Sequence, residues 1–390
     1  MKKFDPPLVL TEAQRVEPRC PHASVCGGCR WQHVDYAHQL ELKRRSIAEA
    51  FTRASIAVEL PPVLPCPEPF YYRNRMDYVF GRNGELGLKP VGKWWETLDL
   101  STCFLLSPQA PEILKRVRDW TRKSGLPFWN VKTHEGFFRY LVIREGKSTG
   151  ERLIMLIVSD QYELTADQRS ELLDLLSPFT TSILIGVNEK ITDLSIPQRI
   201  EVLKGEAYLH EEVNGIRYRI QPASFFQTNT TMAAKLQDAV LEAAGDLEEK
   251  TLLDLYCGAG FLTLALSKKA KRVLGIELDS AAIDAANLNA SLNGINGVEF
   301  IASKVESVDW KGEKPDVVVL DPPRAGLHPD VITALLQVRP ERLIYVSCKY
   351  SKLIEELPKF LEYYALERIQ ALDLFPQTPH VEVVVSLKKL

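Results

Sequence analysis

The 390-residue sequence has no long apolar run, no even set of cysteines and no large excess of one charge. No stretch reaches the roughly 18 apolar residues that a membrane helix needs. The first residues also lack the apolar core of a signal peptide. Seven cysteines, an odd number, argue against a disulfide framework in a chain of this size. These absences favour a cytoplasmic protein that makes no contact with a membrane.

The formal net charge of −3 does not by itself indicate a protein that binds nucleic acid. The cations are grouped locally, however, and arginines alternate with aromatic residues in Tyr71–Tyr78. Such a pattern can stack on bases and hold phosphates. The same alternation suits a half-buried strand, so it is only a weak indication of RNA binding.

The composition, 45% hydrophobic and 25% charged, is typical of a globular chain long enough for two or three domains. Residues 1–34 are irregular and rich in cysteine, and residues 35–60 contain a predicted helix over 35–53. Residues 61–220 begin with a proline-rich connector and then mix paired strands with helices, which predicts an α+β domain. Residues 221–390 alternate strands with helices, which predicts a doubly wound α/β sheet.

A glycine-rich turn, Asp254–Gly260, follows the first strand of this last region. Gly258 and Gly260 allow the backbone to turn tightly and to approach a ligand closely. Glu277 ends the next strand, where a carboxylate can bind ribose hydroxyls. A dinucleotide site would have a third glycine near position 263, where this chain has Thr263. The pattern therefore favours S-adenosylmethionine over NAD, and a purely structural turn is the alternative.

The segment Asp321-Pro322-Pro323-Arg324 ends the fourth strand of the same region. The prolines stiffen the loop and fix the direction of Asp321. Several classes of methyltransferase carry Asp-Pro-Pro or Asn-Pro-Pro here, and those that act on amino groups usually have an aromatic residue next. Arg324 in that position argues against methylation of an amino group.

Cys348 and Glu382 are the candidate catalytic pair. Cys348 follows the fifth strand, at the edge where open α/β sheets bind ligands, and Lys349 or the following helix N-terminus could lower the pKa of its thiol. Glu382 lies in the otherwise apolar segment Val381–Val385, where it either faces solvent or, beside His380, is a buried base. A thiolate that adds to an electron-poor ring and a carboxylate that removes a proton are what methylation of a pyrimidine carbon requires. An inert buried cysteine is the alternative for Cys348.

Cys20, Cys26 and Cys29 have the spacing C-x5-C-x2-C. Three close thiols need a fourth ligand to form a tetrahedral zinc site or a four-iron cluster. The remaining candidates are Cys66 and Cys103, and we favour Cys103, because Cys66 lies between prolines and Cys103 follows a strand-like segment. The spacing does not distinguish zinc from iron–sulfur, and a cluster of cysteines without metal is the remaining alternative.

Taken together, these motifs resemble the RNA (uracil-5-)-methyltransferases of the RumA/TrmA type. The matching segments are Cys20–Cys29, Tyr72–Arg75, Ser224–Asn229, Asp254–Gly260, Asp321–Arg324, Ser347-Cys348 and Phe375–Glu382. They span almost the whole chain in the order that the family has. The resemblance implies a Rossmann-like class I methyltransferase domain at the C-terminus and a central α+β domain that binds RNA.

The resemblance also implies a mechanism. Cys348 would attack C6 of a uridine, C5 would accept the methyl group of S-adenosylmethionine, and Glu382 would remove the C5 proton before the thiol is eliminated.

The cofactor positions of the family match Gln227, Tyr256, Glu277 and Asp321. Of these, Gln227 and Asp321 would also be close enough to touch the uracil.

The family's cluster is a [4Fe-4S] cluster, which the resemblance implies for Cys20, Cys26, Cys29 and Cys103, with a structural role. The cluster favours the branch that methylates 23S rRNA, because the branch that acts on tRNA generally lacks it. The few residues before Cys20 leave no room for the β-barrel (TRAM) domain with which such rRNA enzymes often begin. We expect a monomer that acts on 23S rRNA without an obligate protein partner. The same reaction on a tRNA uridine and a non-catalytic RNA-binding protein of ribosome assembly are the alternatives.

Overall fold

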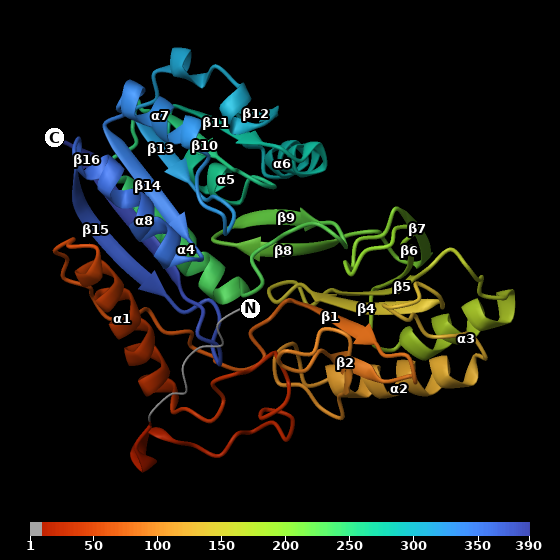
Figure 1. Ribbon diagram of the computed structural model, residues 1–390. Coiled ribbons are helices and arrows are strands. Elements are labelled where there is room, and N and C mark those ends of the chain that lie inside the picture. The colour runs from red at the N-terminus through yellow and green to blue at the C-terminus, as the bar shows by residue number, and fades with distance from the viewer. Residues whose placement is uncertain (1–9) are drawn as a thin grey trace.

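The computed structural model describes residues 10–390, and in it two seven-stranded sheets flank a two-stranded hairpin (Figure 1). The helices are α1 (Tyr36–Arg53), α2 (Ala110–Lys123), α3 (Ala166–Leu176), α4 (Thr230–Ala244), α5 (Phe261–Ser267), α6 (Ser280–Leu292), α7 (Pro329–Val338) and α8 (Tyr350–Leu361), with short 3-10 helices η1 (Glu12–Gln14), η2 (Val305–Ser307) and η3 (Trp310–Glu313). None of the helices in this part of the chain is long and apolar enough to cross a membrane.

The strands fall into three groups along the chain. The central sheet contains β1 (Arg75–Phe80), β2 (Leu86–Leu88), β3 (Leu98–Asp99), β4 (Phe138–Glu145), β5 (Arg152–Val158), β6 (Ser182–Val187) and β7 (Arg199–Lys204). The hairpin consists of β8 (Leu209–Val213) and β9 (Ile216–Ile220). The C-terminal sheet contains β10 (Thr251–Leu255), β11 (Arg272–Glu277), β12 (Val298–Ala302), β13 (Val317–Leu320), β14 (Arg342–Ser347), β15 (Tyr364–Leu372) and β16 (Glu382–Lys389).

The C-terminal sheet has the order β12-β11-β10-β13-β14-β16-β15. The first five of these strands are parallel, and β16 is antiparallel to both of its neighbours. The predicted doubly wound α/β region is therefore confirmed. Because β16 runs against the parallel strands, its first residue lies at the edge where those strands end, which is the ligand-binding edge of such sheets.

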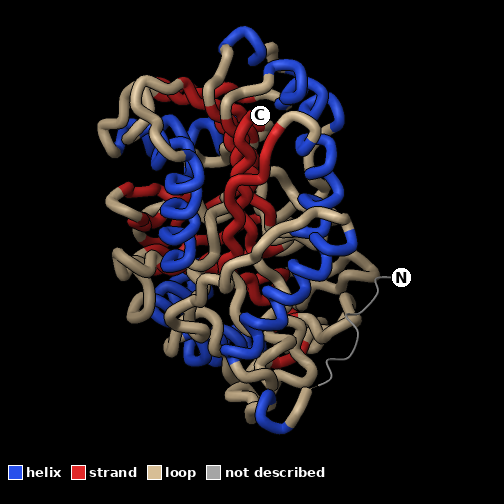
Figure 2. Tube along the Cα trace, turned by 90° about the vertical axis from the view of Figure 1, so that its left-hand side faces the viewer, coloured by secondary structure: helices blue, strands red, loops and turns tan. Residues whose placement is uncertain are grey.

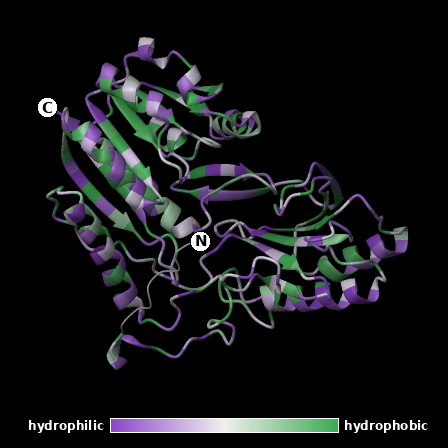
Figure 3. Ribbon diagram, in the orientation of Figure 1, coloured by the Kyte–Doolittle hydropathy of each residue, from purple (hydrophilic) through white to green (hydrophobic). Residues whose placement is uncertain are grey.

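Helices cover both faces of this sheet, which explains why its strands are almost continuously apolar. Leu252 faces the layer that contains α4 and α5, and the next residue, Leu253, faces the layer that contains α1, α7 and α8. Figure 2 shows the strands between two sets of helices, and Figure 3 shows hydrophobic green on the inner strands of the sheet and hydrophilic purple on part of the edge strand β15.

Helix α1 belongs in space to the C-terminal sheet, although more than 190 residues of sequence lie between them. Asp35 caps it by accepting a hydrogen bond from the His38 backbone N–H at 3.2 Å. Ile47 and Phe51 are at most 1% exposed, and they pack in one cluster with the side chains of α8 (Figure 1).

The central sheet has the order β3-β2-β1-β4-β5-β6-β7, and its pairs are antiparallel except for β5 with β6. Helices α2 and α3 pack on one face of it. The other face packs on the β8–β9 hairpin, whose Tyr218 shares a cluster with Leu264 and Ala290 of the C-terminal region. The hairpin thus joins the two sheets, as Figure 1 shows.

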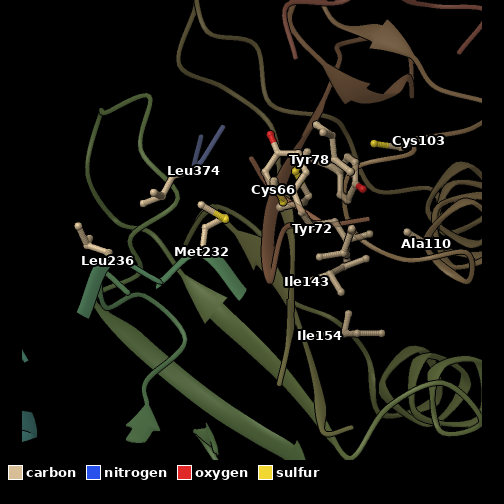
Figure 4. Packing of buried hydrophobic residues seen from close by; sticks show 14 of the residues in the cluster. Cys66, Tyr72, Tyr78, Cys103, Ala110, Ile143, Ile154, Met232, Leu236 and Leu374 are labelled. Atoms are coloured by element: carbon tan, nitrogen blue, oxygen red, sulfur yellow. The ribbon is translucent and has the colours of Figure 1, made fainter. Parts of the chain in front are cut away.

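A second junction lies beside the hairpin and is filled by one large buried cluster (Figure 4). Tyr72 and Ile143 come from the central region, and Met232, Leu236 and Leu374 come from the C-terminal region. Apolar burial of this kind holds the two sheets against each other.

Three strands were not expected from the sequence: β7, β8 and β15. Strand β7 is mostly exposed and lies at a sheet edge, and β15 is an edge strand with a register shift between Leu366 and Arg368. Strand β8 contains Glu211, which is fully buried and accepts hydrogen bonds from the backbone N–H groups of Lys147 and Ser148. Strand β8 breaks the apolar alternation at Glu211, and β7 and β15 are edge strands with many exposed or half-buried residues, so their sequences give little indication of burial.

Candidate active site

Five predicted site elements lie along one edge of the C-terminal sheet. Glu277 ends β11, the turn Tyr256–Gly260 follows β10, and Asp321 follows β13. Cys348 follows β14, and Glu382 is the first residue of β16. Because these strands are adjacent in the order β11-β10-β13-β14-β16, the five elements form a continuous row with Asp321 in the middle.

The glycine turn has the strained geometry of a ligand-binding loop. Gly258 and Gly260 have φ values of 53° and 81°, and Tyr256 has a φ of 70°, which is uncommon for a residue with a side chain. The Gly258 N–H donates to Glu277 Oε2 at 3.2 Å, so the turn is tied to the end of β11. A Cβ added at Gly260 would lie 3.3 Å from Ala286 of α6, a tight contact that adds to the cost of a side chain at this left-handed φ.

Asp254, the first residue of the glycine-rich segment, is a further candidate cofactor residue. The sequence alone indicated no role for it. It is 1% exposed, and its Oδ2 accepts a hydrogen bond from the Thr263 hydroxyl at 2.5 Å. Its Oδ1 has no partner within residues 10–390, and burial raises the pKa of the carboxyl to about 7. Thr263, which stands where a dinucleotide site has glycine, is therefore the partner of this acid. The feature of the sequence that could have indicated this role is a carboxylate within the otherwise apolar strand β10.

Cys348 and Glu382 lie side by side at the ends of neighbouring strands. Ser347 pairs with Val383 in the antiparallel register, so the next residues, Cys348 and Glu382, are opposite each other. Glu382 is 4% exposed, which excludes the solvent-facing alternative. Burial raises the pKa of Glu382 well above its ordinary value, and the Asp321 carboxyl raises it further.

The cation that acts on this pair is Arg324 rather than Lys349. The pKa of the Cys348 thiol is raised by burial and then by Glu382, whereas the charge and hydrogen bond of Arg324 lower it. Arg324 also lowers the pKa of Glu382, and burial raises the pKa of Asp321 to about 7. The pKa of the thiol is therefore raised overall, first by burial and then by Glu382, despite the lowering by Arg324.

Gln227 lies on a loop that the central region holds in place. Asn74 donates from its side chain to the Gln227 carbonyl and from its backbone to the Thr228 carbonyl, both at 2.8 Å. Arg75 donates to the carbonyls of Ala223 and Ser224 at 3.3 Å. The two sequence motifs that contain these residues thus meet directly. The Gln227 side chain makes no hydrogen bond to the row of edge residues within the described part of the chain.

A cationic cavity of about 550 Å³ lies beside this loop. Its basic lining residues are Arg30, Arg73, Arg75, Lys89 and Arg144, and it is also lined by Phe225, Thr378 and His380. Phe225 is 75% exposed, which is unusual for a phenylalanine. Because Thr378 and His380 precede Glu382 in the chain, the cavity adjoins the edge of the sheet. Arginines around an exposed ring fit a nucleotide, with phosphate on the cations and the base on the ring.

Cys103, and not Cys66, lies near the N-terminal cysteines. The pKa of Cys29 is raised to about 12 by burial and by the neighbouring thiols of Cys103, Cys26 and Cys20. Cys66 instead accepts a hydrogen bond from Asn229, and Figure 4 shows it apart from Cys103. All these cysteines are free, and no group of three or more His, Cys, Asp or Glu side chains in residues 10–390 is arranged to hold a metal ion. The iron–sulfur cluster stays a prediction.

Known proteins resemble the chain over nearly its whole length. Residues 190–390 match the family model described as tRNA (uracil-5-)-methyltransferase. A tRNA (uracil(54)-C(5))-methyltransferase of Pyrococcus furiosus is 36% identical over 385 residues, covering 98% of this chain and 88% of the relative. An RNA methyltransferase of Clostridium tetani is 34% identical and covers 96% of this chain and 84% of the relative. The chain belongs to the RNA uracil-5-methyltransferase family.

A solved structure supports the same assignment for the fold of this methyltransferase. The Pyrococcus abyssi tRNA (uracil-54, C5)-methyltransferase, solved in complex with S-adenosyl-L-homocysteine, is 32% identical and superposes with a TM-score of 0.78. The match covers 93% of this chain and 86% of that one. The α/β class I methyltransferase fold of the methyltransferase is therefore confirmed. The named relatives of known specificity act on tRNA, so the expected preference for 23S rRNA is not supported.

The role of Arg324 can be tested by alkylation of Cys348. Replacing Arg324 by alanine removes the cation that favours the thiolate, so the pH midpoint of alkylation by iodoacetamide should rise. Peptide mass spectrometry separates Cys348 from the other six cysteines. Lys349→Ala is the matched control and should leave the midpoint unchanged. A shift of the pH midpoint in the Lys349 variant and none in the Arg324 variant would show that Lys349 is the cation that acts on Cys348.

Proposed function

We propose that this methyltransferase uses S-adenosylmethionine to methylate C5 of a uridine in RNA, with Cys348 as nucleophile and Glu382 as base. The observation that supports this best is the side-by-side position of a thiol and a buried carboxyl at the ends of β14 and β16. The glycine turn lies two strands away, across Asp321. This combination suits methylation of uracil C5, because C5 is too weak a nucleophile until a thiolate has attacked C6.

The reaction begins when the Cys348 thiolate forms a bond to C6 of the uracil ring. The electron pair of the C5–C6 double bond moves toward C5 and O4, and Arg324 beside the thiol favours the thiolate form. C5 would then take the methyl group, and the electron pair of the broken methyl–sulfur bond would stay on the sulfur of the donor. The Glu382 carboxylate takes the C5 proton, the double bond returns, and the C6–S bond breaks to release the thiolate. A buried carboxylate with a raised pKa is a stronger proton acceptor than an exposed one.

The cofactor would be held at the ends of β10 and β11, on the side of the sheet edge away from Cys348 and Glu382. S-adenosylmethionine, when bound, supplies an electrophilic methyl group. Glu277 and the turn residues Tyr256, Gly258 and Gly260 suit its ribose and nearby atoms, because a carboxylate accepts from ribose hydroxyls and glycines allow close approach. Asp321, between cofactor and thiol, can serve both ligands. Gln227 would reach the same centre from the loop that Asn74 holds.

We propose tRNA, with uridine 54 as its target, as the substrate in place of 23S rRNA. The Pyrococcus furiosus relative, a tRNA (uracil(54)-C(5))-methyltransferase, aligns with 98% of this chain, a share that takes in its cysteine-rich segment. The cysteine cluster favoured an rRNA enzyme. The similarity over the whole chain to a tRNA enzyme is the stronger support, and it favours tRNA. The cationic cavity and exposed Phe225 are suited to either RNA, so they do not choose between the two.

We further propose that Cys20, Cys26, Cys29 and Cys103 hold a [4Fe-4S] cluster with a structural role. What supports this is that the four thiols are free and that Cys103, Cys26 and Cys20 lie near enough to Cys29 to raise its pKa, although in residues 10–390 they are not arranged as a formed metal site. Buried thiolates crowded together are stabilised when a cationic cluster binds them. The cluster would tie the N-terminal segment to the central region.

The cluster is tested by metal analysis after purification without oxygen. We expect roughly four irons and four sulfides per chain in the wild type, as for a [4Fe-4S] cluster. Cys103→Ser should lose the iron, and Cys66→Ser, a matched buried cysteine, should keep it. Loss of iron in the Cys66 variant, or zinc in place of iron in the wild type, would contradict the assignment.

The reaction and substrate are tested with radiolabelled S-adenosylmethionine and unmodified transcripts of tRNA and 23S rRNA. Label should enter C5-methyluridine in tRNA and should be absent from a transcript with cytidine at position 54. Cys348→Ala should abolish transfer, and Glu382→Gln should slow it about 10²- to 10⁴-fold, as expected for loss of a general base. Label in 23S rRNA alone would refute the tRNA proposal, and no label in either RNA would refute the reaction.

A further inference from the structure

The segment Asp373–Val381 delivers Glu382 to the active site and makes most of its contacts with the N-terminal part of the chain. It connects β15 to β16, and Glu382 is the first residue after it. Gln377, in the middle of the segment, has a φ of 66°, a left-handed conformation that is costly for a residue with a side chain. Such a conformation persists only where surrounding contacts hold it.

Gln39 of α1 provides those contacts. Its amide nitrogen lies 2.9 Å from Gln377 Oε1, and its amide oxygen accepts the Gln377 backbone N–H at 3.0 Å. The Gln377 carbonyl accepts a third hydrogen bond, at 2.9 Å, from the backbone N–H of Trp31. Gln39 is fully buried and Gln377 is 3% exposed, so water cannot replace these partners.

Two further contacts hold the beginning of the segment. Lys43, one turn further along α1, forms an ion pair with Asp373 at 2.5 Å, and neither side chain is exposed. Lys43 also donates to the Phe375 carbonyl at 3.2 Å, and the Tyr36 hydroxyl donates to Asp373 at 3.0 Å. From the central region, the Tyr72 hydroxyl donates to the Pro376 carbonyl at 3.1 Å.

We infer that Gln39 is a positioning residue for the base Glu382, with the buried Lys43–Asp373 pair as its support. Six backbone or side-chain groups of the segment are held by α1, Trp31 and Tyr72, and Glu382 follows Gln377 by five residues. The inference rests on the proposed function, because it assigns Gln39 a role only in the step in which Glu382 removes the C5 proton. A displaced base leaves the addition of Cys348 and the transfer of the methyl group possible, but it delays release of the thiol.

A misplaced Glu382 should increase the share of enzyme that is bound covalently to RNA. When proton removal is slow, the adduct between Cys348 and C6 of the methylated uridine accumulates, since the C6–S bond breaks only after the proton has left. Gln39→Leu, which keeps the size of the side chain and removes its hydrogen bonds, should reduce kcat about 10- to 100-fold, the effect of a misplacement of about 1 Å. The same variant should increase the fraction of enzyme bound covalently to RNA on a denaturing gel.

The matched control is Gln237→Leu. Gln237 of α4 is also fully buried and donates to the Tyr218 hydroxyl and the Phe261 carbonyl, both at 2.9 Å, but it does not touch the segment. It should lower stability comparably without increasing the covalent fraction. Gln39→Glu keeps an acceptor for the Gln377 N–H but turns an oxygen toward the carbonyls of Trp31 and Val34 and toward Gln377 Oε1, so it should lose kcat as Gln39→Leu does.

Glu382→Gln separates failure of this inference from failure of the proposed function. If Glu382→Gln accumulates the adduct and Gln39→Leu loses activity without doing so, Gln39 is merely structural and the inference is wrong. If neither variant forms an adduct, the covalent mechanism itself is wrong, and the positioning role falls with it.

A second, independent observation concerns an exposed aromatic pair near the cationic cavity. Trp94 and Trp95 are 57% and 45% exposed, and their rings meet edge to face with centroids 5.9 Å apart. The Lys132 amine lies 6.0 Å from the Trp95 ring, and Lys93 pairs with Glu96 at 2.9 Å. Large rings exposed among cations are the pattern of a surface that stacks on bases.

The loop that carries this pair is anchored beside the cavity. Lys89, five residues before Trp94, lines the cavity, and its carbonyl accepts the Gly27 N–H at 3.2 Å. The Val91 N–H donates to the Val25 carbonyl, also at 3.2 Å. The loop is thus held at both the cavity and the cysteine-rich segment, so its rings stay within reach of an RNA strand that leaves the cavity.

We propose that Trp94 and Trp95 stack on an unpaired base of the substrate RNA outside the target nucleotide. A chain with a net charge of −3 needs local features to bind a polyanion; here they are Lys132 beside the Trp95 ring and Lys89, which lines the cavity and is paired with Asp193. This proposal depends on RNA being the substrate and adds a second contact to it.

The test measures RNA affinity and turnover together. Replacing both tryptophans by alanine should weaken binding of the tRNA transcript about 5- to 100-fold, the equivalent of about 1–3 kcal/mol of stacking. The value of kcat at saturating RNA and the affinity for S-adenosylmethionine should not change. Replacing both by phenylalanine should restore most of the affinity, and Leu288→Ala with Leu292→Ala, which removes exposed apolar surface from α6, should have no effect.

Unchanged RNA affinity in the alanine variant would refute the stacking role. A parallel decrease in S-adenosylmethionine affinity would also refute it, since that pattern indicates a disturbed fold. If the wild type binds neither RNA transcript, the proposed function fails first.

Discussion

The backbone pairing between β14 and β16 is the constraint on which the active site depends. Ser347 lies opposite Val383, so the residue after the end of one strand and the first residue of the other become neighbours. A shift of one residue would move Glu382 to the other face of the sheet, away from the thiol. The antiparallel direction of β16 is equally necessary, because only then does a strand begin where its parallel neighbours end.

Burial then decides the chemistry that the pair can perform. Glu382 and Asp321 both have raised pKa values, and the nearby thiol has one as well, because each charged form loses hydration and repels the others. Arg324 opposes this effect at both Cys348 and Glu382. The thiol of Cys348, the carboxyls of Glu382 and Asp321 and the guanidinium of Arg324 thus influence one another's charge. Such a group of residues suits a proposed reaction that uses one anion as nucleophile and another as base.

The rest of the molecule supplies rigidity to loops that would otherwise be free. Asn74 of the central region fixes the loop that carries Gln227, and Gln39 of α1 fixes the segment that ends at Glu382. Both holding residues are far in sequence from what they hold, and both are buried. The central region and the N-terminal segment therefore hold parts of the candidate active site in place.

Local sequence patterns determined much of this protein: the alternating strands and helices after residue 221, the capped helix α1, the glycine turn and the order of the edge motifs. These follow from periodicity and from the special backbone of glycine, which act over a few residues. Tertiary structure alone decided that Arg324 rather than Lys349 acts on Cys348, and that β7, β8 and β15 are strands. Each of these depends on a partner distant in sequence, because charge and burial act through space, and a one-dimensional pattern does not record which segments meet.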